Sequence, residues 1–287
     1  FHMPAFFFIS GFLEGEKRRS ISEKKQAIVK KAKRLMVPYF FLTVVTAVLK
    51  LLFGAFARNP LNYSTLAVDV LIGRNNPNGG LWFLYALFVI SIFGILFDNV
   101  SRTVLAGVMF VLYMLNTVVL KQSGYIVGFF LSYAWIYFMG GAVRKHLFEI
   151  IKNSELLMSV KGIVLIAVVS VGYMMLAFVS IYKSQSWSLA TAVTVIGVFL
   201  LFVIAVQIEH YHCGEKLWMV LGDYGMDIYM IGYYVQQAIF VVCGKILGFD
   251  YLVYAWMMLF LGLIAPIFLS KYVVRKNHML STLILGR

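Results

Sequence analysis

The stretch FHMPAFFFISGF, residues 1–12, opens on His2 and Pro4 and continues as an aromatic run that ends with Ser10 and Gly11. Proline is tolerated in the first turn of a helix, because the N–H that it lacks would have no partner there. A helix also satisfies the backbone of such an apolar run inside a bilayer. We therefore expect a membrane-embedded helix with the titratable His2 at its lip, and close helix packing at Ser10 and Gly11.

The composition extends this expectation to the whole chain. Of 287 residues 62% are hydrophobic and only 13% are charged, where an ordinary soluble domain has about 25%. Several apolar runs of about 20 residues, without the alternation of a β-barrel, predict an all-α, polytopic transmembrane helical bundle. With the opening segment there are about nine membrane segments in a single domain over 1–287; the other eight are 35–57, 81–97, 103–120, 126–143, 162–182, 189–208, 224–247 and 251–270.

The segment from Glu14 to Arg34 is densely basic and follows the opening run directly. Ser20 and Glu23 have the spacing of a capping box, and the apolar residues after them share one face. We expect an amphipathic helix that lies on the membrane surface and leads into the span 35–57.

Lysines and arginines set the orientation. Placing Glu14–Arg34 in the cytoplasm puts nineteen of them in inside loops and five in outside loops, as the positive-inside rule requires. We expect a multi-pass protein of the plasma or inner membrane with a cytoplasmic C-terminus. The formal charge of +13 would favour an anionic partner in a soluble protein; here membrane lipids are expected as partners, and nucleic acid is not.

Four stretches together resemble the acyltransferase 3 family of integral membrane acyltransferases, especially members that act on sugars and polysaccharides. They are FHMPAFFFISGF at 1–12, KKAKRLMVPY at 30–39, GGLWFLYALF at 79–88 and LGDYGMDIYMIGYY at 221–234. The resemblance implies a bundle of roughly ten helices that moves an acyl group, usually acetyl, from cytoplasmic acyl-CoA to a hydroxyl. The acceptor would be a glycan or a lipid-linked sugar. It also implies a first helix upstream of Phe1, so that the chain would be truncated at its N-terminus.

The resemblance places His2 in the histidine-methionine-proline motif of the family. O-acylation needs a base for the hydroxyl proton, and histidine titrates in the useful range. His2 is therefore a candidate catalytic residue, although it could instead orient neighbouring helices. Lys31 and Arg34 match a basic pair, commonly two arginines, that would contact the phosphates of CoA. Alternatively these two residues bind lipid headgroups and set topology.

Aromatic residues open the span 81–97 on the outer side. Trp82 and Tyr85 could stack on a sugar ring of the acceptor, or they could belong to the interfacial belt; Tyr229, in the late motif, is a further candidate for substrate binding. In that motif Asp227 resembles an acidic residue of the family and is a second candidate catalytic residue. Many relatives have a histidine three residues after the motif tyrosine, where this chain has Gly232.

Two other functions remain open at this stage. One is a glycan or lipid-linked-sugar transporter or flippase without chemistry, and the other is an inactive fragment. We expect no metal cofactor, because His210 and His212 beside Glu209 lack the spacing of a metal motif. Acetyl-CoA is expected as the acyl donor and co-substrate.

Overall fold

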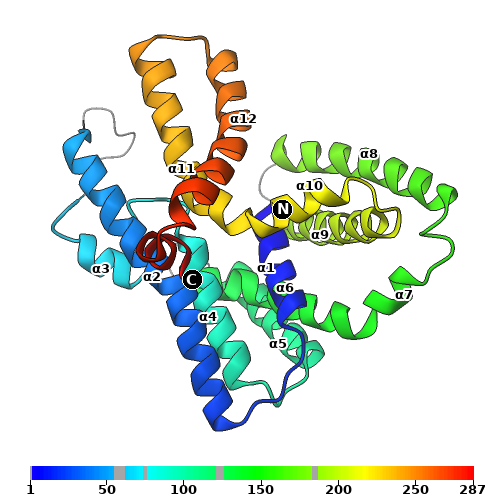
Figure 1. Cartoon of the computed structure of the whole chain (residues 1–287). Coiled ribbons are helices and arrows are strands. Elements are labelled where there is room, and N and C mark those ends of the chain that lie inside the picture. The colour runs from blue at the N-terminus through cyan, green and yellow to red at the C-terminus, as the bar shows by residue number, and fades with distance from the viewer. Residues whose placement is uncertain (1, 55–61, 74–75, 121–125, 183–186) are drawn as a thin grey trace. The chain divides into compact units, whose positions relative to one another are not determined.

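The computed structural model describes residues 2–54, 62–73, 76–120, 126–182 and 187–287, without the side chains of His2, Leu120, Ile181, Tyr182 and Trp187. Every regular element in these ranges is a helix (Figure 1). Seven of the described helices are long and apolar enough to cross a membrane, and two shorter apolar helices, Met3–Glu14 and Trp82–Leu96, accompany them. The predicted polytopic helical bundle is therefore confirmed. The seven long helices are Ile21–Leu52, Arg102–Val119, Ile126–His146, Val160–Ser180, Ser188–His210, Gly225–Ile246 and Tyr251–Val274.

Two predicted segments differ from the observed helices. The predicted span 81–97 is helix α4, Trp82–Leu96, whose 15 residues rise only about 22 Å, less than the roughly 30 Å of a hydrocarbon core. The basic segment was expected to lie on the membrane surface, but it continues without a break into the first span as α2, Ile21–Leu52. Strong helix formers fill the junction, and Pro38 is accommodated inside the helix.

The chain divides into two compact units. One comprises residues 1–24 and 92–215, and the other comprises residues 25–91 and 216–287. The expectation of a single domain over 1–287 stays a prediction.

The first unit is built around helix α6. The opening helix α1 packs along α6, α5 packs on α6 as well, and α8 pairs with α9. Phe7, Tyr137 and Phe138 are almost fully buried in this packing. The helices of the unit are α1 (His2–Glu14), α5 (Arg102–Leu115), α6 (Ile126–His146), α7 (Phe148–Lys152), α8 (Val160–Tyr182) and α9 (Trp187–His210).

The second unit contains the body of α2 and the pair α11 and α12, which lie side by side (Figure 1). A Cβ added at Gly232 of α11 would lie 3.2 Å from the carbonyl oxygen of Gly262 of α12, so the two helices approach closely there. The remaining helices are α3 (Leu66–Leu71), α4 as far as Ser91, α10 (Glu215–Asp223), α11 (Gly225–Ile239), α12 (Tyr251–Leu269) and α13 (His278–Leu280), with π-helical turns at Phe240–Ile246, Ser270–Val274 and Ser281–Leu285.

Candidate functional site

Glycines hold the helix that carries His2 tightly against α6. A Cβ on Gly11 would overlap the backbone of Tyr137, and one on Gly140 would overlap the backbone of Phe8. The ring of Phe7 stacks on Tyr133 with 4.8 Å between the centroids. The close packing predicted for Gly11 is confirmed, because small residues let two helices approach to backbone contact.

The turn that follows α1 is fastened by a buried arginine. Arg102 is 2% exposed and donates from Nε to the carbonyl oxygen of Gly15 (3.1 Å) and from Nη1 to that of Gly94 (3.0 Å). The guanidinium also lies over the ring of Phe138. A buried charge is tolerated when its donors are paired, so Arg102 fixes where α1 ends.

Two further contacts hold the same turn. Arg144 Nη1 donates to the carbonyl oxygens of Phe12 (3.1 Å) and Leu13 (2.8 Å). Lys145 Nζ lies 2.7 Å from Oε2 of Glu16, and this hydrogen bond holds the pKa of the Glu16 carboxyl below its usual value. The position of His2 along the first unit is therefore set from the far end of a rigid helix. The backbone of His2 belongs to α1, whereas its side chain lies outside the described residues.

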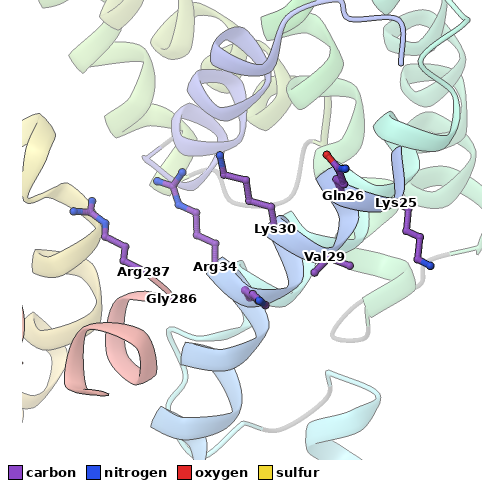
Figure 2. A pocket seen from close by; sticks show the side chains of 8 residues that line it. Lys25, Gln26, Val29, Lys30, Arg34, Gly286 and Arg287 are labelled. Atoms are coloured by element: carbon purple, nitrogen blue, oxygen red, sulfur yellow. The ribbon is translucent and has the colours of Figure 1, made fainter. Parts of the chain in front are cut away.

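A basic pocket of about 680 Å³ lies in the second unit, on the polar end of α2 (Figure 2). Helix α2 has 32 residues and is about 48 Å long, so about 18 Å of it extends beyond a hydrocarbon core of roughly 30 Å. The end that extends is the basic one. The residues that line the pocket are Lys25, Gln26, Val29, Lys30, Lys33, Arg34, Gly286 and Arg287, and none of these described side chains is acidic.

Of the predicted basic pair, Arg34 lines this pocket and Lys31 does not. Lys30 takes the place expected for Lys31, since residues four apart on a helix lie on one face, as do residues three apart. In Figure 2 the side chains of Lys30 and Arg34 project to the same side of α2, where Arg287 also lies, and Lys25 points away. Lys30, Arg34 and Arg287 therefore converge on one side of the helix.

Asp227 lies at the start of α11 in an ion-pair network and is fully buried. Its Oδ2 accepts hydrogen bonds from Oγ of Ser270 and, at 2.7 Å, from Nε of Arg275. Nη1 of Arg275 also lies 2.7 Å from Oδ2 of Asp223, and its guanidinium stacks over the ring of Tyr224 at 3.9 Å. Burial alone lowers the pKa of Arg275, but its bonds to the two carboxylates raise that pKa overall. One carboxylate oxygen of Asp227, Oδ2, is thus engaged by structural partners.

The aromatic residues predicted to bind an acceptor lie around the start of α4. Tyr85 donates its hydroxyl to the carbonyl oxygen of Leu71 (2.8 Å) and stacks on Tyr39 with 5.3 Å between the centroids. Tyr229 donates to the carbonyl oxygen of Gly80 and meets the ring of Phe83 edge to face. Both hydroxyls therefore fasten the backbone before α4.

Trp82 is the first residue of α4 and is half-buried, with its ring perpendicular to that of Phe83.

Comparison with known families identifies the fold. The acyltransferase domain of the acyltransferase 3 family matches residues 1–275, which is nearly the whole chain. The chain belongs to this family. It is a multi-pass membrane protein with the acyltransferase architecture. No curated protein and no solved structure matches the chain at a significant level.

Membership in the acyltransferase 3 family gives weight to the departure at Gly232. A side chain at this position would start 3.2 Å from the carbonyl oxygen of Gly262 and 3.8 Å from Cγ of Pro266. The carbonyl oxygen of Gly262 would have to shift by a few tenths of an ångström to admit any side chain there, so Gly232 allows the close packing of α11 and α12.

Five cationic residues of the basic pocket and the Asp227 network were not predicted to bind a ligand or to pair with Asp227: Lys25, Lys30, Lys33, Arg275 and Arg287. Lys30 and Lys33 lie within the basic segment; the four-residue spacing of Lys30 from Arg34 was the available signal, and no such spacing relates Lys33 to Arg34. Arg275 and Arg287 are far in sequence from the residues that they accompany, so only the tertiary fold brings them together.

Proposed function

We propose that this member of the acyltransferase 3 family transfers an acyl group, most simply acetyl, from acyl-CoA to a hydroxyl of a glycan, polysaccharide or lipid-linked sugar. The observation that carries the proposal is the basic pocket on the end of α2 that extends beyond the membrane. The orientation that places this end in the cytoplasm agrees with the distribution of lysine and arginine. Acyl-CoA is available on that side.

Charge complementarity supports CoA as the donor. Its diphosphate and 3′-phosphate together carry roughly four negative charges near neutral pH. Lys30, Lys33, Arg34 and Arg287 offer four cationic groups in one pocket. Arginine holds a phosphate with two parallel hydrogen bonds and lysine acts as a point charge, so the set suits a polyphosphate better than a single carboxylate.

The chemical step needs a base near the acceptor hydroxyl. The hydroxyl oxygen attacks the thioester carbonyl carbon, the hydroxyl proton passes to the base, and the C–S bond breaks to release CoA. His2 is the proposed base, because imidazole accepts a proton near neutral pH. From Glu14 to His2 the 13 residues of α1 rise about 20 Å, less than the thickness of a hydrocarbon core, so with Glu14 at one membrane surface His2 would lie at membrane depth.

The acceptor would be bound from the other side, with Trp82 as the stacking platform. Tyr85 and Tyr229 would shape that surface through the backbone that they fasten, and Asp227 would support it by keeping α11 in place through Arg275. In this proposal these three residues act by position and do not contact reacting atoms.

The test uses membranes that contain the full-length protein, with radiolabelled acetyl-CoA and an extracted glycan or lipid-linked-sugar fraction. We expect label to enter the acceptor and free CoA to appear in equal amount. The variants His2→Ala and Arg34→Gln should each reduce transfer at least tenfold, whereas Lys216→Gln, an exposed cation outside the pocket, should leave it unchanged. Movement of the sugar across the membrane without release of CoA would identify a transporter instead.

A further inference from the structure

A short segment after the last span folds back onto the basic end of α2. Asn277 starts it by accepting hydrogen bonds from the backbone N–H groups of Met279 (3.0 Å) and Leu280 (3.2 Å). The helical turns that follow pack against α11, and Leu285 is 1% exposed. This segment, residues 277–287, is therefore anchored by a buried side chain rather than loosely attached.

Gly286 makes the closest contact with α2. Its φ is +66°, a left-handed conformation that costs glycine little, and it closes the turn by donating its N–H to the carbonyl oxygen of Thr282 (3.0 Å). A Cβ at this position would lie 2.5 Å from Cα of Arg34 and 2.7 Å from the carbonyl oxygen of Lys33. Only glycine fits such an approach, and the approach delivers Arg287 to the pocket.

Arg287 adds a cation that α2 cannot supply by itself. It lines the pocket together with Lys30, Lys33 and Arg34, and it lies on the same side as Lys30 and Arg34 (Figure 2). The carbonyl oxygen of Arg287 accepts a hydrogen bond from Oγ1 of Thr282 at 2.8 Å, which fixes its backbone. One wall of the pocket is thus α2, and the other is the 277–287 segment.

This second wall lies outside the part of the chain that matches the family, because the match ends at residue 275. The pocket therefore joins a helix inside the matched domain to a segment that follows the end of the match.

We propose that the 277–287 segment completes a phosphate-binding site, with Arg287 binding the phosphorylated nucleotide end of CoA and Gly286 positioning it. The inference rests on the proposed function for the identity of the ligand. Phosphate is also the chemistry of anionic lipid headgroups, so the experiment must separate a soluble nucleotide from a lipid.

The experiment measures the dissociation constant of 3′,5′-ADP and of CoA for the full chain in nanodiscs made only of zwitterionic lipid. We expect Arg287→Gln to raise the dissociation constants of both ligands about threefold to tenfold and to make them less dependent on salt concentration. Arg287→Lys should recover part of the lost affinity. Pantetheine, which lacks the nucleotide, should bind to Arg287→Gln as well as it binds to the wild type. A merely structural effect would alter pantetheine as well.

Gly286→Ala tests the positioning, and Gly248→Ala is its matched control. Gly248 has a φ of +65° but nothing within 4 Å of an added Cβ, so both variants carry the same backbone strain and only Gly286→Ala meets α2. We expect Gly286→Ala to raise the dissociation constant of 3′,5′-ADP at least as much as Arg287→Gln does. Gly248→Ala should bind 3′,5′-ADP like the wild type.

Three results would overturn the proposal. If the wild type binds CoA, Arg34→Gln weakens it and Arg287→Gln does not, the 277–287 segment has no part in binding and the proposed function stands. If the wild type binds neither CoA nor 3′,5′-ADP, both proposals fail. If the variants alter only the association of anionic lipid added to the nanodiscs, the pocket is a lipid site.

Discussion

Nε of Arg275 lies 2.7 Å from Oδ2 of Asp227, across the junction between the end of α12 and the start of α11. Asp227 is fully buried, and its other carboxylate oxygen, Oδ1, has no hydrogen-bond partner in the described part of the chain. Arg275 therefore supplies the charge that makes a buried carboxylate tolerable, and it is itself shared with Asp223.

Removing this arginine should be far more harmful than removing its exposed partner. Arg275→Met leaves a buried carboxylate unpaired, and we expect a loss of roughly 3–5 kcal/mol in the free energy of unfolding. Asp223→Asn removes a half-exposed partner and should cost about 1 kcal/mol or less. Thermal unfolding of the purified protein in detergent measures both. Asp227→Asn removes the buried charge itself and leaves Arg275 paired with Asp223, so it should cost less than Arg275→Met; an Asp227→Asn protein of normal stability without transfer would show that Asp227 takes part in the chemistry.

Helix packing in the first unit can be tested with glycines that differ in their surroundings. Gly140→Ala places a methyl group against the backbone of Phe8, so α1 must move away from α6; we expect a lower melting temperature and loss of acyl transfer. Gly172→Ala on α8 has nothing within 4 Å and should be neutral or slightly stabilising, because alanine favours a helix over glycine by roughly 1 kcal/mol. Equal effects of the two variants would contradict the close approach of α1 and α6.

The sequence predicted those parts of the fold that depend on neighbouring residues. Hydropathy predicted the long spans, and the capping box is formed, with the backbone N–H of Ser20 donating to Oε2 of Glu23 at 2.7 Å. The sequence could not show which of the adjacent residues Lys30 and Lys31 lines the pocket. One residue turns a helix by about 100°, and the other wall of the pocket, at Gly286, is more than 250 residues away in sequence. The hydrogen bond from Tyr229 to Gly80 could not be predicted from local sequence either, since it joins residues 149 positions apart.

Acid should destabilise the first unit through Asp98. Lys24 Nζ lies 2.6 Å from its Oδ1, and the backbone N–H of Arg19 donates to its Oδ2 at 2.9 Å. Burial alone raises the pKa of this carboxyl, but these partners hold it below the usual value. A carboxyl whose pKa is lowered by folding stabilises the protein fully above its unfolded pKa, near 4, and loses this contribution as the pH falls through the folded value.

The measurement is the melting temperature between pH 7 and about pH 3. We expect Asp98→Asn to be less stable than the wild type at pH 7 and to lose less stability on acidification. Glu155→Gln, which removes an exposed carboxylate, should follow the wild-type curve. If Asp98→Asn also follows the wild-type curve, the contacts with Lys24 and Arg19 contribute nothing to stability.

The acceptor side can be separated from the donor side by kinetics. We expect Trp82→Ala to raise the KM for the glycan acceptor about tenfold, because the sugar ring loses the aromatic face on which it stacks. The dissociation constant of CoA should be unchanged. Tyr229→Phe deletes the hydrogen bond to Gly80 and should cost roughly 0.5–1.5 kcal/mol of stability with a smaller effect on KM. A Trp82→Ala protein with normal KM and kcat would place this ring in the interfacial belt.

The clearest contrast between sequence pattern and structure concerns two adjacent lysines. Lys30 and Arg34 line the basic pocket and Lys31 does not, although the family motif pairs Lys31 with Arg34. We therefore expect Lys30→Gln to raise the KM for acetyl-CoA about threefold to tenfold without changing kcat, since a cation on the pocket binds substrate and transition state alike. Lys31→Gln should alter this KM less than twofold. The effect of Lys30→Gln should shrink as salt is raised from 50 to 500 mM, because ions screen exposed charges beyond a few ångströms. If Lys31→Gln raises the KM and Lys30→Gln does not, the donor lies on the face that the motif indicates, and the pocket on α2 is not where CoA binds.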